Sequence, residues 1–279
     1  TLGREREGSG VVIDANGLVL TIGYLMVEAH AAEITTNEGR TVPAEIVGYD
    51  YDTGFGLLRA AAPLKVRPMP LGRSADIRTG DRVLVASGGG IDMVGAAEVA
   101  AKREFAGYWE YLLDEALFAA PPHPAWSGAA LVSRDGRLLG IGSLVVGDTS
   151  GTGGGVPGNM FVPIDLLPPI LADLVANGRV VARPRPWLGL NTVEVDGALT
   201  VNRVQKGGPA ERAGVRKGDT ILGIGGTPTA RLGDFYRRLF GSGEAGVSVP
   251  LDLGRDGAKL RLDLKSVNRH DHLKLNSTF

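Results

Sequence analysis

Short apolar runs separated by turn residues fill the chain between Gly10 and Val162. The stretch GVVIDANGLVLTI predicts two strands that turn at Asn16-Gly17, and AEITTNEGRTVPAEIVG predicts a second hairpin that turns near Gly39. Similar runs recur in DRVLVAS, GAAEVAA, ALVSRDGRLLGIGSL and NMFVPI. Many short strands at this close spacing are typical of an antiparallel barrel or sandwich, so we expect a mainly β fold.

A helix and a proline-containing linker end this series of strands. Apolar residues recur at helical spacing between Leu167 and Val175, and Gly178 can end the helix. The segment RVVARPRP follows, and its prolines stiffen the chain, so we place a domain boundary near Arg183. The predicted parts are a first domain over 1–183, a second over 184–268 and a polar C-terminal tail over 269–279.

The second domain mixes strand and helix patterns. The strand-like stretch ALTVNRVQ leads to GGPAERAGVRKGDTILGIGG, and a final hairpin is predicted around Asp256-Gly257. Between them, ARLGDFYRRLFG carries Leu232, Phe235 and Leu239, which can share one face of a helix. This order predicts a small α+β domain.

The composition argues against several classes of function. The net charge is -1 and no basic run occurs, which disfavours a groove for nucleic acid. The chain has 0 cysteines, which excludes disulfides and thiolate metal sites. No G-x-x-x-x-G-K pattern or metal-ligand spacing occurs, so we expect neither a cofactor nor a metal. No apolar run approaches the roughly 20 residues of a membrane-spanning helix.

Taken together, the two parts resemble the HtrA/DegP family of serine proteases over almost the whole chain. The resemblance is carried by GSGVVIDANGLVLT, PLGRSADIRTGDRVLVAS, SGAALVSRDGRLLGI and GGPAERAGVRKGDTILGIGGTP, which occur in the family's order. It implies a trypsin-like double β-barrel over the first part and a C-terminal PDZ domain over the second.

The resemblance also locates the three positions of the catalytic triad. In TIGYLMV, Tyr24 stands where the family has its histidine. In DYDTGFGLLR, Gly54 stands where the family has its aspartate, and we expect it to be a strand glycine. In AWSGAA, Ser127 remains at the nucleophile position as a vestigial serine.

These replacements remove the chemistry of the triad. Tyrosine has a pKa near 10 against about 6.5 for histidine, so Tyr24 would be a neutral phenol and a poor proton acceptor. Loss of a triad member costs about 10⁴–10⁶ in turnover, and the sequence indicates no partner for Ser127. Asp52 is displaced by ~6–7 Å from the catalytic place. His123 is the better rescue candidate, although we interpret it as a polar loop residue.

The residues before Ser127 also differ from the family pattern. The family has glycine two residues before the serine, where it helps to aim a backbone N–H at the developing oxyanion. Here that residue is Ala125, which resists a left-handed backbone. This change adds to the expectation that peptide hydrolysis is lost.

In the second domain, WLGL resembles the loop with which PDZ domains of the family bind a peptide's C-terminal carboxylate. The predicted peptide-binding residues are Trp187, Leu188, Gly189 and Leu190 of this loop, with Leu232 and Phe235 of the helix. An extended peptide would be added to the edge of the sheet beside them. The alternative for the helix residues is ordinary core packing.

We therefore expect a pseudoprotease that binds peptides, unfolded segments or protein C-termini through its PDZ domain in a chaperone, adaptor or regulatory role. Two alternatives stay open: an active serine endopeptidase of protein quality control with a rewired site around Ser127, and a structural subunit. The resemblance further implies a homotrimer or co-assembly with an active relative. It also implies a location in the bacterial periplasm or cell envelope.

Overall fold

The computed structural model describes residues 5–273, and these divide into two compact units. The first unit holds 5–103 and 115–180, and the second holds Glu104–Asp114 and 181–273. The predicted domain limits remain predictions, but one boundary near Arg183 cannot describe this division. The reason is that residues 104–114, the end of the hairpin formed by β7 and β8, pack with the second unit.

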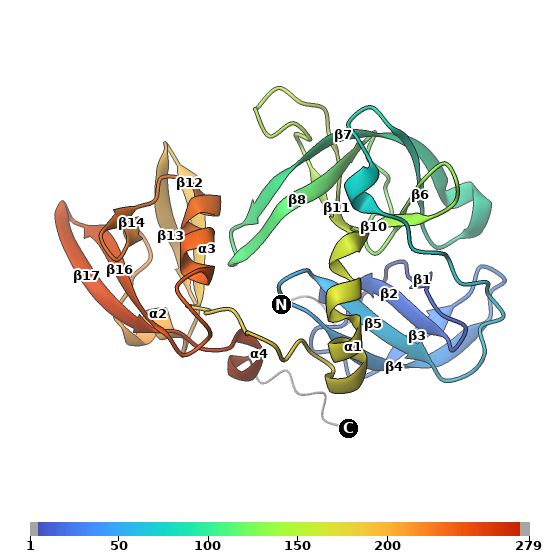
Figure 1. The fold of residues 1–279 in the computed structure, drawn as a ribbon, viewed down its shortest axis with the longest axis horizontal. Helices are drawn as coiled ribbons and strands as arrows, with labels where there is room; N and C mark the ends of the chain where they lie inside the picture. The colour runs from blue at the N-terminus through green and yellow to red at the C-terminus, as the bar shows by residue number, and fades with distance from the viewer. Residues whose placement is uncertain (1–4, 274–279) are drawn as a thin grey trace. The chain divides into compact units, whose positions relative to one another are not determined.

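The first half of the first unit is a five-stranded antiparallel sheet in the order β1-β2-β5-β4-β3 (Figure 1). Both predicted N-terminal hairpins are confirmed, with turns at Asn16-Gly17 and near Gly39. The elements are β1 (Val11–Val12), β2 (Leu18–Ile22), the 3-10 helix η1 (Gly23–Leu25), β3 (Ala32–Thr35), β4 (Thr41–Tyr49) and β5 (Phe55–Ala60).

The second half of the first unit is a closed barrel in the order β10-β11-β8-β7-β6-β9. Its core contains Val85, Val99, Leu117, Leu131 and Phe161, all buried. The elements are η2 (Ser74–Asp76), β6 (Arg82–Ala86), η3 (Gly90–Met93), β7 (Val94–Gly107), β8 (Tyr111–Ala120), β9 (Ala130–Val132), β10 (Leu138–Val146) and β11 (Gly158–Pro163).

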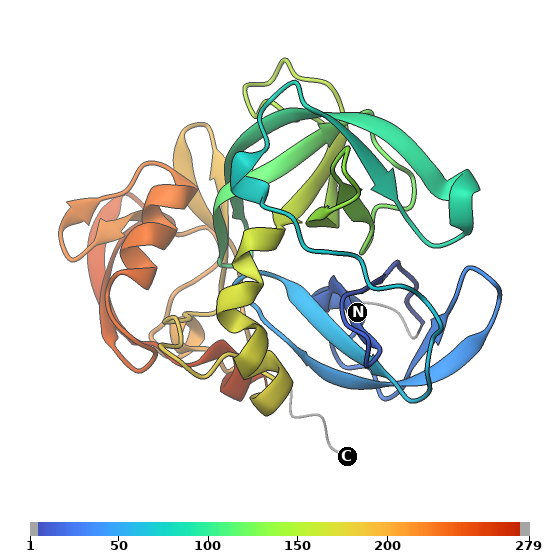
Figure 2. The same cartoon turned by 45° about the vertical axis from the view of Figure 1, so that its right-hand side comes forward.

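Helix α1 (Pro168–Asn177) follows the short η4 (Ile164–Leu166) and closes the first unit (Figure 2). It ends at Gly178, whose φ of 69° is the left-handed conformation expected of a C-terminal glycine cap. A Cβ added to Gly48 on β4 would lie 2.2 Å from the Gly178 oxygen. Glycine at this position therefore lets the helix end approach β4 closely.

The second unit has a sheet in the order β12-β13-β14-β16-β17, with β15 paired to β14. Strand β12 is an edge strand. The elements are β12 (Leu190–Val195), β13 (Ala198–Val204), α2 (Pro209–Arg212), β14 (Thr220–Ile224), β15 (Thr227–Pro228), α3 (Leu232–Phe240), β16 (Ser248–Arg255), β17 (Ala258–Lys265) and α4 (Arg269–His272). The predicted hairpin at Asp256-Gly257 is confirmed.

The predicted polar tail does not begin as loose chain. Residues Arg269–His272 form α4, and the Asn268 side chain caps it by accepting a hydrogen bond from the His270 N–H. The rest of the predicted tail, 274–279, lies outside the described residues. Every helix in the described part of the chain is too short or too polar to span a bilayer.

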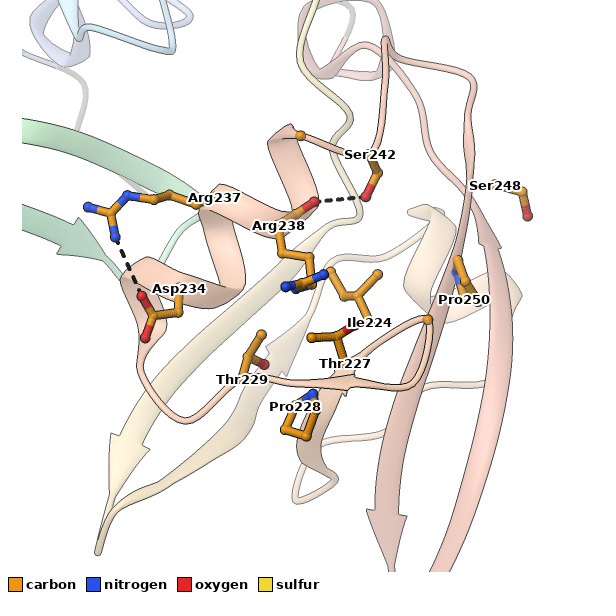
Figure 3. Close-up of a pocket in the computed structure, with 12 residues that line it drawn as sticks. Ile224, Thr227, Pro228, Thr229, Asp234, Arg237, Arg238, Ser242, Ser248 and Pro250 are labelled. Carbon is orange, nitrogen blue, oxygen red and sulfur yellow. Dashed lines mark hydrogen bonds and ion pairs between the residues drawn. The ribbon is translucent and has the colours of Figure 1, made fainter.

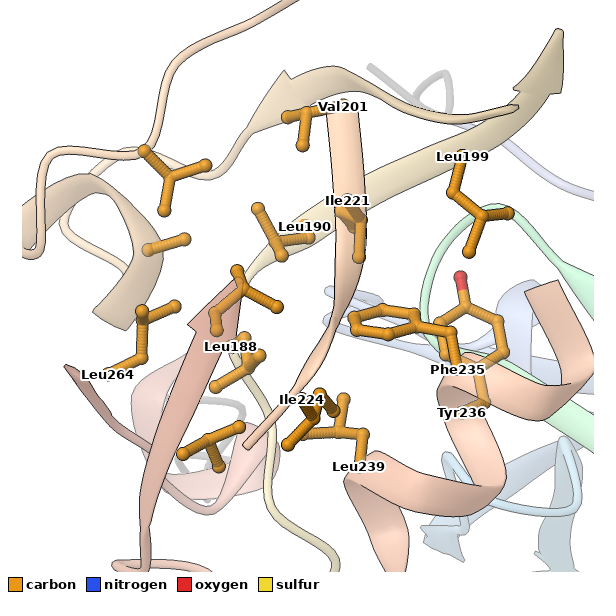
Figure 4. Packing of buried hydrophobic residues seen from close by; sticks show 14 of the residues in the cluster. Leu188, Leu190, Leu199, Val201, Ile221, Ile224, Phe235, Tyr236, Leu239 and Leu264 are labelled. Carbon is orange, nitrogen blue, oxygen red and sulfur yellow. The ribbon is translucent and has the colours of Figure 1, made fainter. Parts of the chain in front are cut away.

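The core of the second unit forms between α3 and the sheet. Figure 4 shows Phe235 and Leu239 projecting from α3 toward Ile221 and Ile224 of β14. The same cluster includes Leu112, the second residue of strand β8. This contact explains why residues 104–114 belong to the second unit.

Candidate functional site

The hydroxyls of Tyr24 and Ser127 are hydrogen-bonded to each other. Tyr24 lies in η1 directly after β2, and Ser127 lies in the loop before β9. The Tyr24 hydroxyl donates to Ser127 Oγ at 2.8 Å and lies 3.1 Å from the backbone oxygen of Ser143. The structure thus brings together the residues that stand at the histidine and serine positions, a pairing that the sequence did not indicate.

In this pair, Tyr24 is the donor. Burial raises the pKa of Tyr24 above its ordinary value, and hydrogen bonds with Ser127 and Trp126 oppose that effect only in part. A neutral phenol gives its proton to a hydrogen bond and is a poor acceptor for the proton of an alcohol. Ser127 Oγ therefore accepts a hydrogen bond where a nucleophilic serine would donate one to its base.

Gly54 lies in the turn between β4 and β5, so the expectation of a strand glycine is wrong. Its φ of 86° is left-handed, a conformation that favours glycine. Its oxygen accepts a hydrogen bond from the Gly23 N–H at 2.7 Å. The Asp50 carboxylate accepts from the Thr53 N–H at 2.8 Å within the same turn. At this position the backbone holds the start of η1, and glycine has no side chain that could orient Tyr24.

His123 lies in the loop between β8 and β9, as interpreted from the sequence, but its side chain is buried. The Nδ1 of its ring accepts a hydrogen bond from the Ala125 N–H at 3.2 Å. The backbone N–H of His123 donates to Asn159 Oδ1 at 2.6 Å. Within residues 5–273, no hydrogen bond joins His123 to Ser127. The imidazole instead takes up the Ala125 N–H, at the position where the family has its glycine.

The N-terminal segment also holds the backbone at Ser127 in place. The Ser9 N–H donates to the Ser127 oxygen at 2.7 Å. Gly128 has φ of 74°, and a Cβ added there would lie 2.0 Å from the Ser9 oxygen. Glycine is therefore required at position 128, because a side chain would strain the left-handed backbone and would clash with Ser9.

In the second unit, three successive backbone N–H groups point at one carboxylate. The N–H of Leu188 donates to Glu110 Oε2 at 2.9 Å, and those of Gly189 and Leu190 donate to Oε1 at 2.7 and 2.6 Å. Gly189 has φ of 83°, which turns its N–H inward. The loop predicted from WLGL thus binds an internal carboxylate through three N–H groups, and its binding of a peptide's C-terminal carboxylate stays a prediction.

Sequence reasoning missed Glu110. It lies in the turn between β7 and β8, within AGYWEY, and is only 6% exposed. Burial raises the pKa of its carboxyl from 4.5 to about 7, against the hydrogen bonds of the loop and the charge of Arg269. In the structure Glu110 has φ of 57°, a left-handed conformation in which glycine or asparagine is favoured. The sequence alone carries no signal of this conformation.

The remaining predicted peptide-binding residues are placed around this loop. Trp187 pairs its backbone with Val267 and packs its ring against His272, with ring centroids 4.9 Å apart. Leu232 and Phe235 lie on α3 and are buried in the core of the second unit. Their burial fits the core-packing alternative, and their part in a groove stays a prediction.

A separate open hollow of about 840 Å³ lies between α3, the turn from β14 to β15 and β16 (Figure 3). Ile224, Pro228 and Pro250 line it together with the polar side chains of Arg237 and Arg238. It contains none of the residues predicted as a site, and we assign it no role.

Comparison with known proteins identifies a domain type for each part of the chain. Residues 8–141 match the family model of the trypsin-like peptidase domain, and residues 186–266 match that of the PDZ domain. In both domains the chain is similar to HtrA/DegP-like proteases. Its trypsin-like fold followed by a PDZ fold is thereby confirmed.

Several HtrA/DegP-like relatives cover most of this chain. It is 31% identical to protease Do-like 1, chloroplastic, from Arabidopsis thaliana over 84% of the chain. It is 27% identical to the periplasmic pH-dependent serine endoprotease DegQ from Escherichia coli over 93% of the chain. The chain spans 57% and 59% of the length of these two relatives.

Solved structures of the same type are also similar. The HtrA-type protease AlgW with decapeptide superposes with a TM-score of 0.60 at 26% identity, over 94% of this chain and 82% of that one. The AlgW structure with tripeptide gives a TM-score of 0.58 at 25% identity, over 93% and 88%. Both of these structures contain AlgW together with a peptide.

Proposed function

We propose that this HtrA/DegP-like protein is inactive as a peptidase and binds peptides or protein C-termini through its PDZ domain. The observation that carries the proposal is the convergence of the Leu188, Gly189 and Leu190 N–H groups on a carboxylate. Such a nest, beside the edge strand β12, fits a peptide that ends in a free carboxylate and adds a strand to the sheet. The role served would be that of a chaperone, an adaptor or a regulator.

The proposed inactivity rests on the site around Ser127. The group beside its Oγ is a neutral phenol that donates, and Gly54 supplies no carboxylate. Loss of single triad members alone costs about 10⁴–10⁶ in turnover, so hydrolysis should fall to background. The alternative of a rewired endopeptidase is supported only by the survival of Ser127 next to a titratable group.

Labelling with a fluorophosphonate separates these alternatives. We expect no mass shift of the intact protein, because nothing removes the proton from Ser127 Oγ. Ser127→Ala is the control. A shift that disappears in this variant would establish a nucleophilic serine and contradict the proposed inactivity.

Assembly and location are proposed from relatives. The chain would form a homotrimer or co-assemble with an active relative, and only co-assembly would let this inactive chain present peptides to an active one. A periplasmic or cell-envelope location is supported by the name of the DegQ relative, while another relative is named as chloroplastic. A mass from light scattering tests the first point: a monomer would exclude the homotrimer for this chain.

A further inference from the structure

We infer that the peptide groove of the PDZ domain already holds an internal ligand, the hairpin tip Gly107–Tyr111, with Glu110 in the place of a C-terminal carboxylate. An external peptide would bind only by displacing this tip. The inference rests on the proposed peptide-binding function and deepens it, because it names the competitor and the chemistry that a displacing ligand must have.

The carboxylate of Glu110 accepts hydrogen bonds from three successive N–H groups of the loop. Leu188, Gly189 and Leu190 each give it one N–H, at 2.6–2.9 Å. Arg269 on α4 adds electrostatic attraction, and its Nη1 donates to the Trp109 oxygen at 3.2 Å. A peptide carboxylate needs the same three N–H groups, so the two cannot occupy the loop together.

The hairpin tip also imitates the backbone of a bound peptide. Two residues before Glu110, the Tyr108 oxygen accepts a hydrogen bond from the Thr192 N–H at 2.9 Å. Thr192 lies on the edge strand β12, two residues after Leu190. A backbone bond to an edge strand, in step with a carboxylate in the adjoining loop, is how β-augmentation holds an extended peptide.

The helix on the other side of the groove holds the tip as well. The Tyr236 hydroxyl on α3 donates to the Gly107 oxygen at 2.9 Å and accepts from the Glu110 N–H at 3.1 Å. Tyr236 is fully buried. These bonds join the two ends of the turn to α3, so the tip contacts both walls and the loop.

Charged and apolar side chains flank these contacts. Arg237, which Figure 3 shows projecting from α3, forms ion pairs with Glu104 on one hairpin strand and Asp114 on the other. Leu112 is buried in the core of the second unit. The hairpin is thus held by several contacts at once: hydrogen bonds to the loop, β12 and α3, ion pairs with Arg237, and the buried side chain of Leu112.

The backbone of Glu110 provides an independent observation. Its φ of 57° is one that side-chain-bearing residues rarely adopt, and glycine would relieve it. A turn that served only to join β7 to β8 would favour glycine there. The carboxylate and its three hydrogen bonds give a reason for glutamate at this position.

This arrangement defines what can displace the tip. The ligand needs a free carboxylate for the loop and an extended backbone for the edge of β12. As a probe we choose a fluorescein-labelled heptapeptide with the sequence of residues 104–109 followed by leucine, which ends in a free carboxylate. Its C-terminal amide is the negative probe.

The experiment compares Glu110→Gly with the full-length wild type by fluorescence polarisation. Glycine suits the turn and removes the carboxylate. Asp256→Gly is the matched control, because Asp256 is exposed and has φ of 50° in the turn between β16 and β17. A groove occupied in about 90% of molecules lowers apparent affinity about tenfold. We therefore expect Glu110→Gly to bind the acid probe at least tenfold more tightly, and Asp256→Gly to match the wild type.

The outcomes separate the inference from the proposed function. Equal binding of the acid probe by the wild type and Glu110→Gly would overturn the internal ligand and leave the peptide-binding function standing. Binding by no variant, or equal binding of the amide, would overturn the function. Hydrogen exchange then still decides the inference: the Leu188–Leu190 amides should lose protection in Glu110→Gly, and retained protection would overturn it.

Discussion

At the scale of single residues, the replacement of a catalytic base by Tyr24 changes the direction of a hydrogen bond. The phenol is buried enough that its pKa rises, so it stays a donor to Ser127 Oγ and lies near the Ser143 oxygen. The pair that would generate a nucleophile in an active triad becomes a structural contact. Its measurable effect should then be on stability.

We expect Tyr24→Phe to lower the free energy of unfolding by about 1 kcal/mol, the usual net contribution of a buried hydrogen bond. Urea denaturation monitored by tryptophan fluorescence measures it. Tyr108→Phe is the control, because Tyr108 is 51% exposed. A Tyr24→Phe protein as stable as the wild type would show that the contact contributes nothing.

At the scale of elements, the strands were predictable and the hairpin tip was not. Turn pairs such as Asn16-Gly17 act locally, so the sequence around them determines a hairpin whatever the rest of the chain does. The use of Glu110 depends instead on a loop about 80 residues later, and no local pattern encodes that distance. The family resemblance identified the loop but not what fills it.

The docked tip should respond to pH. Glu110 faces Tyr236 from α3, Arg269 from α4 and the N–H groups of the loop, and burial raises its pKa from 4.5 to about 7. The docked carboxyl binds its proton more tightly than the released one. The stabilisation of the docked state by this protonation is therefore fully present below pH 4.5. This stability is lost as the pH rises through about 7.

The measurement is the difference in unfolding free energy between the wild type and Glu110→Gln from pH 4.5 to 8. The glutamine amide does not titrate, and the contributions of all other titratable groups cancel in the difference between the two proteins. The wild type should lose stability relative to the variant as the pH rises, by no more than about 1.4 kcal/mol per pH unit. Parallel curves would show that Glu110 does not titrate differently on docking.

At the scale of the whole molecule, strand β8 contributes to two cores. Leu112 is buried with the second unit, whereas Leu117, five residues later on the same strand, is buried in the barrel. A division into consecutive domains therefore fails at this hairpin. The sequence could not reveal it, because both residues are ordinary apolar positions of a β-strand pattern.

This assignment predicts that two similar substitutions on one strand weaken different units. Leu112→Ala should lower hydrogen-exchange protection in the second-unit sheet, β12 to β17, by about 2–5 kcal/mol, because it leaves a cavity in that core. Leu117→Ala should have an effect of the same order on the barrel strands β6 to β11. If Leu112→Ala lowered protection only in the barrel, the hairpin tip would belong to the first unit in solution, and the docked Glu110 would be excluded with it.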